Sequence, residues 1–157
     1  MLKVAIKLFG LFLLILLIEV TIIPSISSSL RIDLFLGLIM GLVIYAPFTY
    51  GVVSTFIFSF LLQAFSGVRL GVFPFVYVGA YLGIEFVKDI IYLESIVSQV
   101  VVACIFNILI ASITGGLMDR WFIEEGLLPL IFGTALTGLF APVMTFTIKQ
   151  LWPADES

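Results

Sequence analysis

The residue of this sequence whose type and position most suggest chemistry is Glu19, an acid inside a long apolar stretch. Residues 4–23 are apolar apart from Lys7 and Glu19. An acid inside a membrane helix is costly, and it usually pairs with another group or takes part in transport. We favour the hypothesis that Glu19 is a polar clamp, bonded to a neighbouring helix or to a partner protein. The alternative, a proton or ion relay, needs a second buried acid, and Glu85 is expected at the opposite end of the molecule.

Other polar residues in apolar stretches favour packing roles. Glu85 is followed three positions later by Lys88, a spacing that predicts an ion pair on one helix face. Gln99 and Asn107 lie in another apolar stretch, and amides there usually form hydrogen bonds between helices. A substrate-binding role for these two amides is the alternative.

Residue types that catalysis and metal binding require are scarce. The sequence has no histidine and one cysteine, Cys104, so the usual base that activates a serine or threonine is missing. No Walker-type glycine pattern for phosphate binding is found. Seven basic residues against ten acidic ones also argue against a nucleic-acid partner. We predict a protein that is not an enzyme and has no cofactor or metal site.

The composition indicates an integral membrane protein. Of 157 residues, 62% are hydrophobic and only 11% are charged, and the mean hydropathy is +1.32. Soluble domains have about 45–50% apolar and about 25% charged residues. We predict an all-α, polytopic membrane protein in which residues 1–157 form one domain, a compact bundle of six transmembrane helices.

Charged and turn-forming residues divide the chain into these six stretches. Residues 34–68 contain no charge and are too long for one span. We divide them at Pro47, because proline disfavours helix interiors. One long helix kinked at Pro47 is the alternative. The predicted spans are 4–23, 33–45, 48–65, 72–87, 95–118 and 127–148.

The lysines near the N-terminus predict the orientation. Lys3 and Lys7 precede or begin the first span, and positive residues favour the cytoplasmic side. An even number of spans then places the C-terminus in the cytoplasm as well.

Two glycine pairs with the spacing of close helix contacts occur in the predicted spans. They are Gly37 with Gly41, and Gly79 with Gly83. Such pairs let helices approach closely. We favour packing within this chain over oligomerisation, and the oligomeric state stays open.

Three segments of the chain resemble the rod shape-determining protein MreD family. The first helix of that family ends with a polar residue and then a proline, here Glu19 to Pro24. The second helix begins with a Pro-Asp-Leu-Leu-like run, here Ile32-Asp33-Leu34-Phe35. The third closes with an Asp-Leu-Leu-Ser-Gly-like turn, here Gln63 to Gly71. The chain departs from the family pattern at Ile32, where proline is usual, and at Gln63, where aspartate is usual.

The turns in these segments also have a physical interpretation. Asp33 can cap the start of a helix, and Gly67 and Gly71 permit backbone angles that other residues resist. The turn that begins at Ser66 and the polar segment after Pro24 are predicted on the same, outer side. We hypothesise that they dock a partner's helix together with Glu19.

The resemblance implies a scaffold of the machinery that elongates the lateral cell wall, in the bacterial inner membrane. The implied partners are a bitopic MreC-like protein, with an MreB-type filament and cell-wall synthases as the wider machinery. The alternative is the substrate-capture subunit of an energy-coupling-factor vitamin transporter. Such subunits commonly carry an Ala-x-x-x-Ala-like contact on the first helix, whereas here Ala5 is followed by Phe9. That alternative also requires a polar ligand pocket at the outer face.

Overall fold

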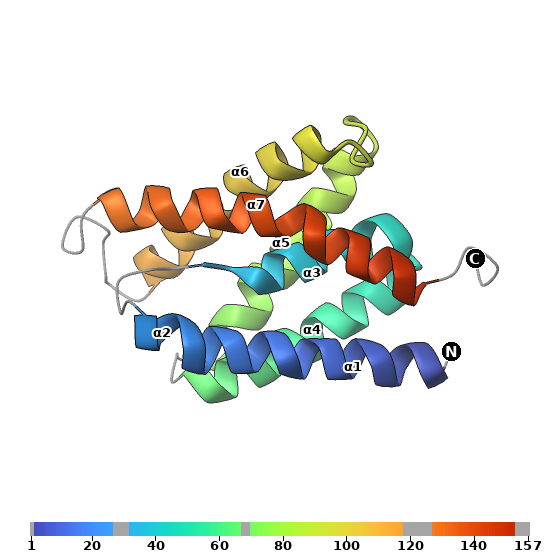
Figure 1. Ribbon diagram of the computed structural model, residues 1–157, viewed down its shortest axis with the longest axis horizontal. Coiled ribbons are helices and arrows are strands. Elements are labelled where there is room, and N and C mark those ends of the chain that lie inside the picture. The colour runs from blue at the N-terminus through green and yellow to red at the C-terminus, as the bar shows by residue number, and fades with distance from the viewer. Residues whose placement is uncertain (1, 27–31, 67–69, 118–126, 153–157) are drawn as a thin grey trace.

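Helices form most of the part of the chain that the computed structural model describes, which is residues 2–26, 32–66, 70–117 and 127–152 (Figure 1). Successive long helices run in alternating directions. The elements are α1 (Leu2–Leu17), the π-helical turn η1 (Ile18–Ile22), α2 (Ile23–Ile26), α3 (Leu34–Tyr45), α4 (Phe48–Ser66), α5 (Val72–Lys88), α6 (Ile96–Leu117) and α7 (Leu127–Leu151).

The first helix is longer than the sequence predicts. α1, η1 and α2 form one continuous helix to Ile26, although we expected a turn from Pro24 onwards. Proline lacks an N–H and crowds the carbonyl four residues earlier. A π-helical turn absorbs this conflict, because the Ile23 N–H bonds to the Ile18 oxygen, five residues back. Glu19 lies on this turn, and π-helical turns occur frequently at functional sites.

The uncharged stretch around Pro47 forms two helices and not one kinked helix. α3 ends at Tyr45 and α4 begins at Phe48. Ala46 between them is extended, with φ −91° and ψ 152°, which is the conformation that a following proline favours. The division predicted at Pro47 is therefore confirmed.

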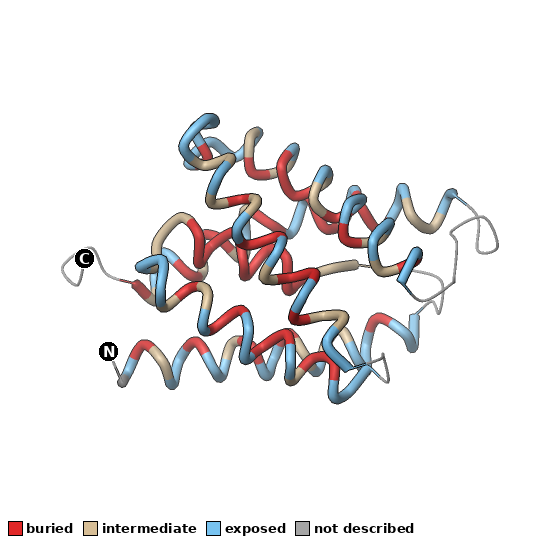
Figure 2. The backbone as a smooth tube through the Cα atoms, turned by 180° about the vertical axis from the view of Figure 1, so that it is seen from behind, coloured by how far each residue is buried: buried red, intermediate tan, exposed pale blue. Residues whose placement is uncertain are grey.

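α3 is the centre of the molecule. All residues from Leu34 to Val43 are buried, and the helix contacts α1, α4, α5, α6 and α7. Figure 2 shows continuous burial along this central helix, whereas the surrounding helices alternate between buried and exposed residues. The fold therefore encloses a short helix within a ring of longer ones.

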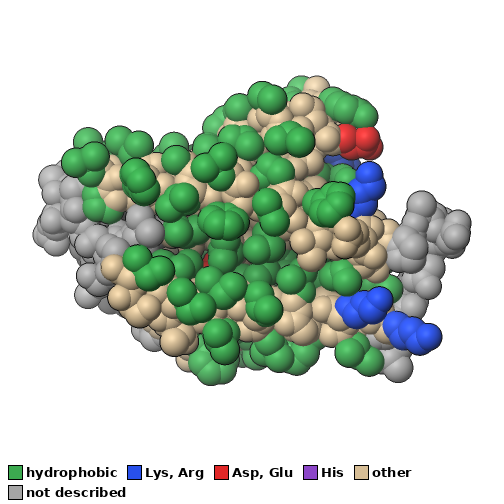
Figure 3. Space-filling view, viewed as in Figure 1, with side chains coloured by type: hydrophobic (Ala, Val, Ile, Leu, Met, Phe, Trp, Pro, Cys, Tyr) green, Lys and Arg blue, Asp and Glu red, His purple; other side chains and the backbone are tan. Residues whose placement is uncertain are grey.

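The outer surface of the bundle suits a lipid environment. Large apolar side chains such as Leu14, Phe56 and Leu128 are exposed, and apolar side chains cover most of the face in Figure 3. Among the described residues, four helices are long and apolar enough to cross a membrane: Lys3–Ile26, Phe48–Ser66, Ile96–Leu117 and Leu127–Leu151. α3 has only 12 residues and α5 has 17. The all-helical bundle is thus confirmed for the described ranges, and six membrane crossings stay a prediction.

The start of α1 and the end of α7 lie at the same end of the bundle (Figure 1). Lysine side chains gather at this end in Figure 3. α3 begins inside the bundle, in the half away from this end, and the candidate site lies at its start (Figure 1).

Candidate functional site

The start of α3 is inside the bundle, so its backbone donors need partners from the protein. A 12-residue helix is about 18 Å long, much shorter than the hydrocarbon core of a membrane, which is about 30 Å thick. The first N–H groups of any helix have no partner within the helix. Glu19 of η1 and the N-cap residue Asp33 provide acceptors for them here.

Glu19 and Asp33 cap α3 together. Glu19 Oε1 accepts a hydrogen bond from the Phe35 N–H at 2.9 Å, and Asp33 Oδ1 accepts one from the Leu36 N–H at 2.8 Å. The N–H of Asp33 itself donates to Thr137 Oγ1 at 2.9 Å. Both carboxyl groups lie at the positive end of the α3 dipole, which favours negative charge. Glu19 therefore bonds a neighbouring helix, as the clamp hypothesis predicts.

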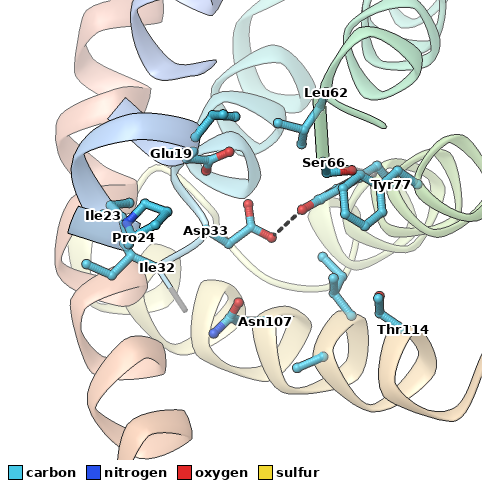
Figure 4. A pocket seen from close by; sticks show the side chains of 14 residues that line it. Glu19, Ile23, Pro24, Ile32, Asp33, Leu62, Ser66, Tyr77, Asn107 and Thr114 are labelled. Atoms are coloured by element: carbon cyan, nitrogen blue, oxygen red, sulfur yellow. Dashed lines mark hydrogen bonds between the residues drawn. The ribbon is translucent and has the colours of Figure 1, made fainter. Parts of the chain in front are cut away.

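Tyr77 of α5 joins this cluster. Its hydroxyl donates to Asp33 Oδ2 at 2.9 Å (Figure 4), and its ring packs edge-on against Phe35 at 4.8 Å between centroids. Hydrogen bonds to a charged acceptor are stronger than those between neutral groups. Tyr77 thus fixes the Asp33 carboxyl group and links α5 to the start of α3.

A cavity of about 260 Å³ lies beside the two carboxyl groups. Figure 4 shows Glu19, Asp33 and Tyr77 grouped around it, with Asn107 and Thr114 on the facing helix. Most of the wall is apolar, and η1, α2, α4, α5 and α6 all contribute to it. The lining residues are Glu19, Val20, Ile23, Pro24, Ile32, Asp33, Leu62, Ser66, Phe73, Tyr77, Asn107, Ile110, Ala111 and Thr114.

Asn107 and Thr114 add oxygen atoms to the α6 side of the cavity. Asn107 is only 5% exposed, and its Nδ2 donates to Thr134 Oγ1 of α7 at 3.0 Å. This bond joins α6 to α7, which is the kind of contact that the sequence predicts for Asn107. The amide oxygen then faces Asp33 (Figure 4). Thr114 Oγ1 is buried without a hydrogen-bond partner among the described residues.

Gln63 caps α5 at the edge of the cavity. Its Oε1 accepts hydrogen bonds from the N–H groups of Gly71 at 2.9 Å and Phe73 at 3.3 Å. Ser66 Oγ donates to the Gln63 carbonyl at 3.1 Å. Gly71 has a φ of +93°, which glycine adopts without strain. Gly67 lies outside the described residues.

The glycines of the α3 pair are packing residues remote from the cavity. A Cβ on Gly37 would lie 3.1 Å from Met144 side-chain atoms, and one on Gly41 would lie 2.7 Å from Ile148 Cγ1. Both contacts are with α7, so these glycines serve the chain's own packing. The second pair behaves differently, because Gly79 has open space beside it while Gly83 faces the Phe106 ring.

The polar residues at the other end of α3 form a separate group. Lys88 Nζ bonds Glu85 Oε1 at 2.7 Å, which confirms the predicted ion pair. The same ammonium group donates to the Val43 carbonyl at 3.0 Å and so caps the end of α3. Gln99 bonds the Leu93 carbonyl in the preceding loop at 2.9 Å. A bond between Gln99 and another helix was expected, and that expectation is wrong.

The sequence interpretation missed several members of the site. It treated Asp33 as a helix cap and not as the second acid beside Glu19, and it singled out neither Tyr77 nor the threonines. One sequence feature could have indicated that Asp33 lies inside the bundle. Asp33 begins a predicted span that is too short to cross a membrane. Tyr77, Thr114, Thr134 and Thr137 have no sequence pattern that separates them from other polar residues in spans.

The arrangement has the form of a small-molecule binding site. Within the described ranges, no group of three His, Cys, Asp or Glu residues could hold a metal ion. The polar lining consists mainly of acceptors, which are two carboxyl groups, an amide oxygen and hydroxyl oxygens. A cavity with apolar walls and a few convergent polar groups is the usual form of a small-molecule site.

Comparison with known proteins provides no independent assignment. No protein-family model matches this chain, no curated protein matches it, and no solved structure matches it.

Proposed function

We propose that this protein is a non-enzymatic scaffold of the cell-wall elongation machinery in the bacterial inner membrane, with both termini in the cytoplasm. The observation that carries the proposal is the convergence of the three MreD-like segments. They are separated along the chain, yet they lie around one cavity at the start of α3. Short motifs that lie together around one cavity support membership of the family better than the same motifs would if they were scattered over the fold.

A specific bond joins the first two segments, and the third lies beside them at the cavity. Glu19 of the first segment accepts from Phe35 of the second. Asp33 of the second is bound by Tyr77, which follows the third segment. Within the third, Gln63 accepts from Gly71. Gln63 stands where the family usually has aspartate, and its amide oxygen performs the capping that a carboxylate oxygen would perform.

Contact with a partner would have to be made mainly within the membrane. α3 and α4 are joined by two residues, and α5 and α6 by the short segment 89–95. Membrane helices associate through close packing and hydrogen bonds. The Glu19 carboxyl group is already bound to α3, so we assign it to holding the first helix in place. The bitopic MreC-like partner would then meet the apolar helix surfaces, and the MreB-type filament and synthases would act through that complex.

Depletion of the protein in its rod-shaped host tests the function. We expect cells to become round and wide while vitamin uptake stays normal. Re-expression of the intact chain should restore rods, and expression of an unrelated membrane protein should not. Rods that persist under full depletion would contradict the scaffold function.

One observation favours a second function, the substrate-capture subunit of a vitamin transporter. That class requires a polar ligand pocket at the outer face, and the cavity at Glu19 and Asp33 lies near α2 and the start of α5, away from the start of α1 where Lys3 and Lys7 lie. The transporter function is less favoured because Phe9 stands where the Ala-x-x-x-Ala-like contact of that class would need a small residue. Purification followed by mass spectrometry of bound small molecules distinguishes the two, because a capture subunit should release a vitamin and show an uptake defect on depletion.

A further inference from the structure

We propose that the cavity beside α3 binds an ammonium group, carried by a free organic amine or by the headgroup of an aminophospholipid, through Glu19 and Asp33. This inference goes beyond the scaffold function and holds for either of the two functions above. It concerns the chemistry of the ligand, and its test does not depend on cell shape or on vitamin uptake.

The acceptor capacity of the two carboxyl groups is the first argument. A carboxylate offers about four acceptor positions. The described donors use one position on Glu19, from Phe35, and two on Asp33, from Leu36 and Tyr77. Both groups line the cavity, so further acceptor positions face it. An ammonium group has three donors and no acceptor, which matches this lining.

The facing helix provides the second argument. Asn107 is almost fully buried, its amide nitrogen is used by Thr134, and its oxygen points toward Asp33 (Figure 4). Thr114 adds a buried hydroxyl oxygen with no partner in the described ranges. A buried polar atom without a partner is expensive, so a ligand that donates hydrogen bonds here stabilises the protein.

The size and walls of the cavity favour an organic cation over a bare ion. A volume of about 260 Å³ is far larger than one ion needs. Phe73 and Tyr77 line it and contact one another edge-on, with centroids 5.7 Å apart. Aromatic faces attract ammonium groups, and the apolar walls suit the carbon skeleton attached to one. An anion would find few free hydrogen-bond donors in this lining, because Asn107, Ser66 and Tyr77 already donate to acceptors within the protein.

Three probes of equal shape and different charge test the recognition directly. The intact protein in lipid nanodiscs is titrated with phenethylammonium, 2-phenylethanol and phenylacetate, and binding is measured by equilibrium dialysis against empty nanodiscs. We expect phenethylammonium to bind at least about tenfold more tightly than the other two, since a hydrogen bond to a charged group contributes about 1.5–3 kcal/mol. Equal binding of the three probes would overturn the proposal.

Two variants that keep the caps locate the site. Glu19→Gln and Asp33→Asn retain an oxygen for the α3 N–H groups but remove the charge, so we expect about ten- to a hundredfold weaker phenethylammonium binding. Glu94→Gln, in the exposed loop at the other end, is the matched control and should bind as the parent does. Equal loss in all three variants would contradict the assignment to this cavity. If a cavity variant fails to fold, the selectivity of the parent protein among the three probes still tests whether the protein recognises an ammonium group.

A further experiment with lipids distinguishes the two sources of the ammonium group. Native mass spectrometry of the purified protein compares retention of phosphatidylethanolamine with phosphatidylglycerol of the same acyl chains. Preferential retention of phosphatidylethanolamine that Glu19→Gln abolishes identifies a lipid headgroup. Binding of phenethylammonium without this preference identifies a free amine. If phenethylammonium does not bind and neither lipid is preferred, the proposal is wrong.

Discussion

Gly41 illustrates how one residue decides the packing of the central helix. A Cβ at this position would lie 2.7 Å from Cγ1 and 2.8 Å from Cβ of Ile148. Cβ is attached directly to the backbone, so α7 itself would have to move. Gly79 also belongs to a pair of glycines four residues apart, yet nothing lies within 4 Å of the position that its Cβ would take. The two glycines look alike in the sequence and differ entirely in their surroundings.

We therefore expect opposite results from the same substitution at the two positions. Gly41→Ala should destabilise the bundle by about 1–3 kcal/mol because it overpacks the α3–α7 contact. Gly79→Ala should be neutral or stabilising by up to about 1 kcal/mol, since alanine is the better helix former. Thermal unfolding in one detergent, followed by circular dichroism, measures both. Equal Tm values for Gly41→Ala and the parent would show that α7 adjusts freely.

Gln63 is the second residue whose role can be isolated. It is 2% exposed, and its Oε1 caps two N–H groups of the turn before α5. Gln63→Leu removes the acceptor and should destabilise the protein by about 1–3 kcal/mol. Gln63→Glu keeps the acceptor and places a negative charge at a helix start, where it is favourable. We therefore expect the Tm of Gln63→Glu to be at least equal to that of the parent, and the Tm of Gln63→Leu to be lower than both. If Gln63→Leu is as stable as the parent, Gln63 does not act as a cap.

At the scale of elements, α3 is held by acidic side chains at its start and by a basic side chain near its end. Glu19 and Asp33 bind its first N–H groups, and Lys88 binds the carbonyl of Val43 near its last turn. Acidic groups at a helix start and basic groups near its end complement the helix dipole. A short helix buried in a bundle has no water at its ends, so these side chains replace the solvent.

Removal of the Glu19 carboxyl group should loosen the start of α3. In Glu19→Leu the Phe35 N–H loses its acceptor, and its hydrogen exchange should accelerate by about ten- to a hundredfold. Glu19→Gln keeps an oxygen acceptor and should have a much smaller effect. Hydrogen exchange with mass spectrometry on the peptide that covers residues 32–40 measures this, with a peptide from α6 as the internal control. Unchanged exchange in Glu19→Leu would mean that Asp33 alone caps the helix.

At the scale of the whole molecule, the alternating directions of successive helices determine which helix ends lie together. The start of α1 and the end of α7 are at one end (Figure 1). The cavity is at the other end, near the starts of α3 and α5 and the last turn of α4. If all six helices cross the membrane, the termini and the α5–α6 loop share one side and the cavity opens toward the other.

Reporter fusions test this orientation. Enzymatic reporters placed after Glu94 and after Ser157 should both report the cytoplasm, because Lys3 and Lys7 favour the inside for the N-terminus. A reporter inserted in the segment 118–126 should report the opposite side. A periplasmic signal at Ser157 would mean an odd number of crossings, and the short helix α3 would then be the first candidate for one that does not cross.

Sequence patterns alone predict the helical class, the division at Pro47 and the ion pair of Glu85 with Lys88. These features are local: apolar stretches between charges predict helices, proline restricts the residue before it, and a spacing of three places two side chains on one face. The same local rules failed at Pro24, since a π-helical turn lets the first helix continue to Ile26.

Which polar residues meet depends on how the helices pack, and no sequence pattern predicts it. Glu19 and Asp33 line the same cavity because α3 is central and short, and no rule of spacing links residues on different helices. Tyr77 bonds Asp33 across 44 positions of sequence, and Asn107 bonds Thr134 across 27. The cavity exists because helices packed around a short helix leave space beyond its end. Helix length is local and can be read from sequence, whereas the space that a short helix leaves depends on the positions of all its neighbours.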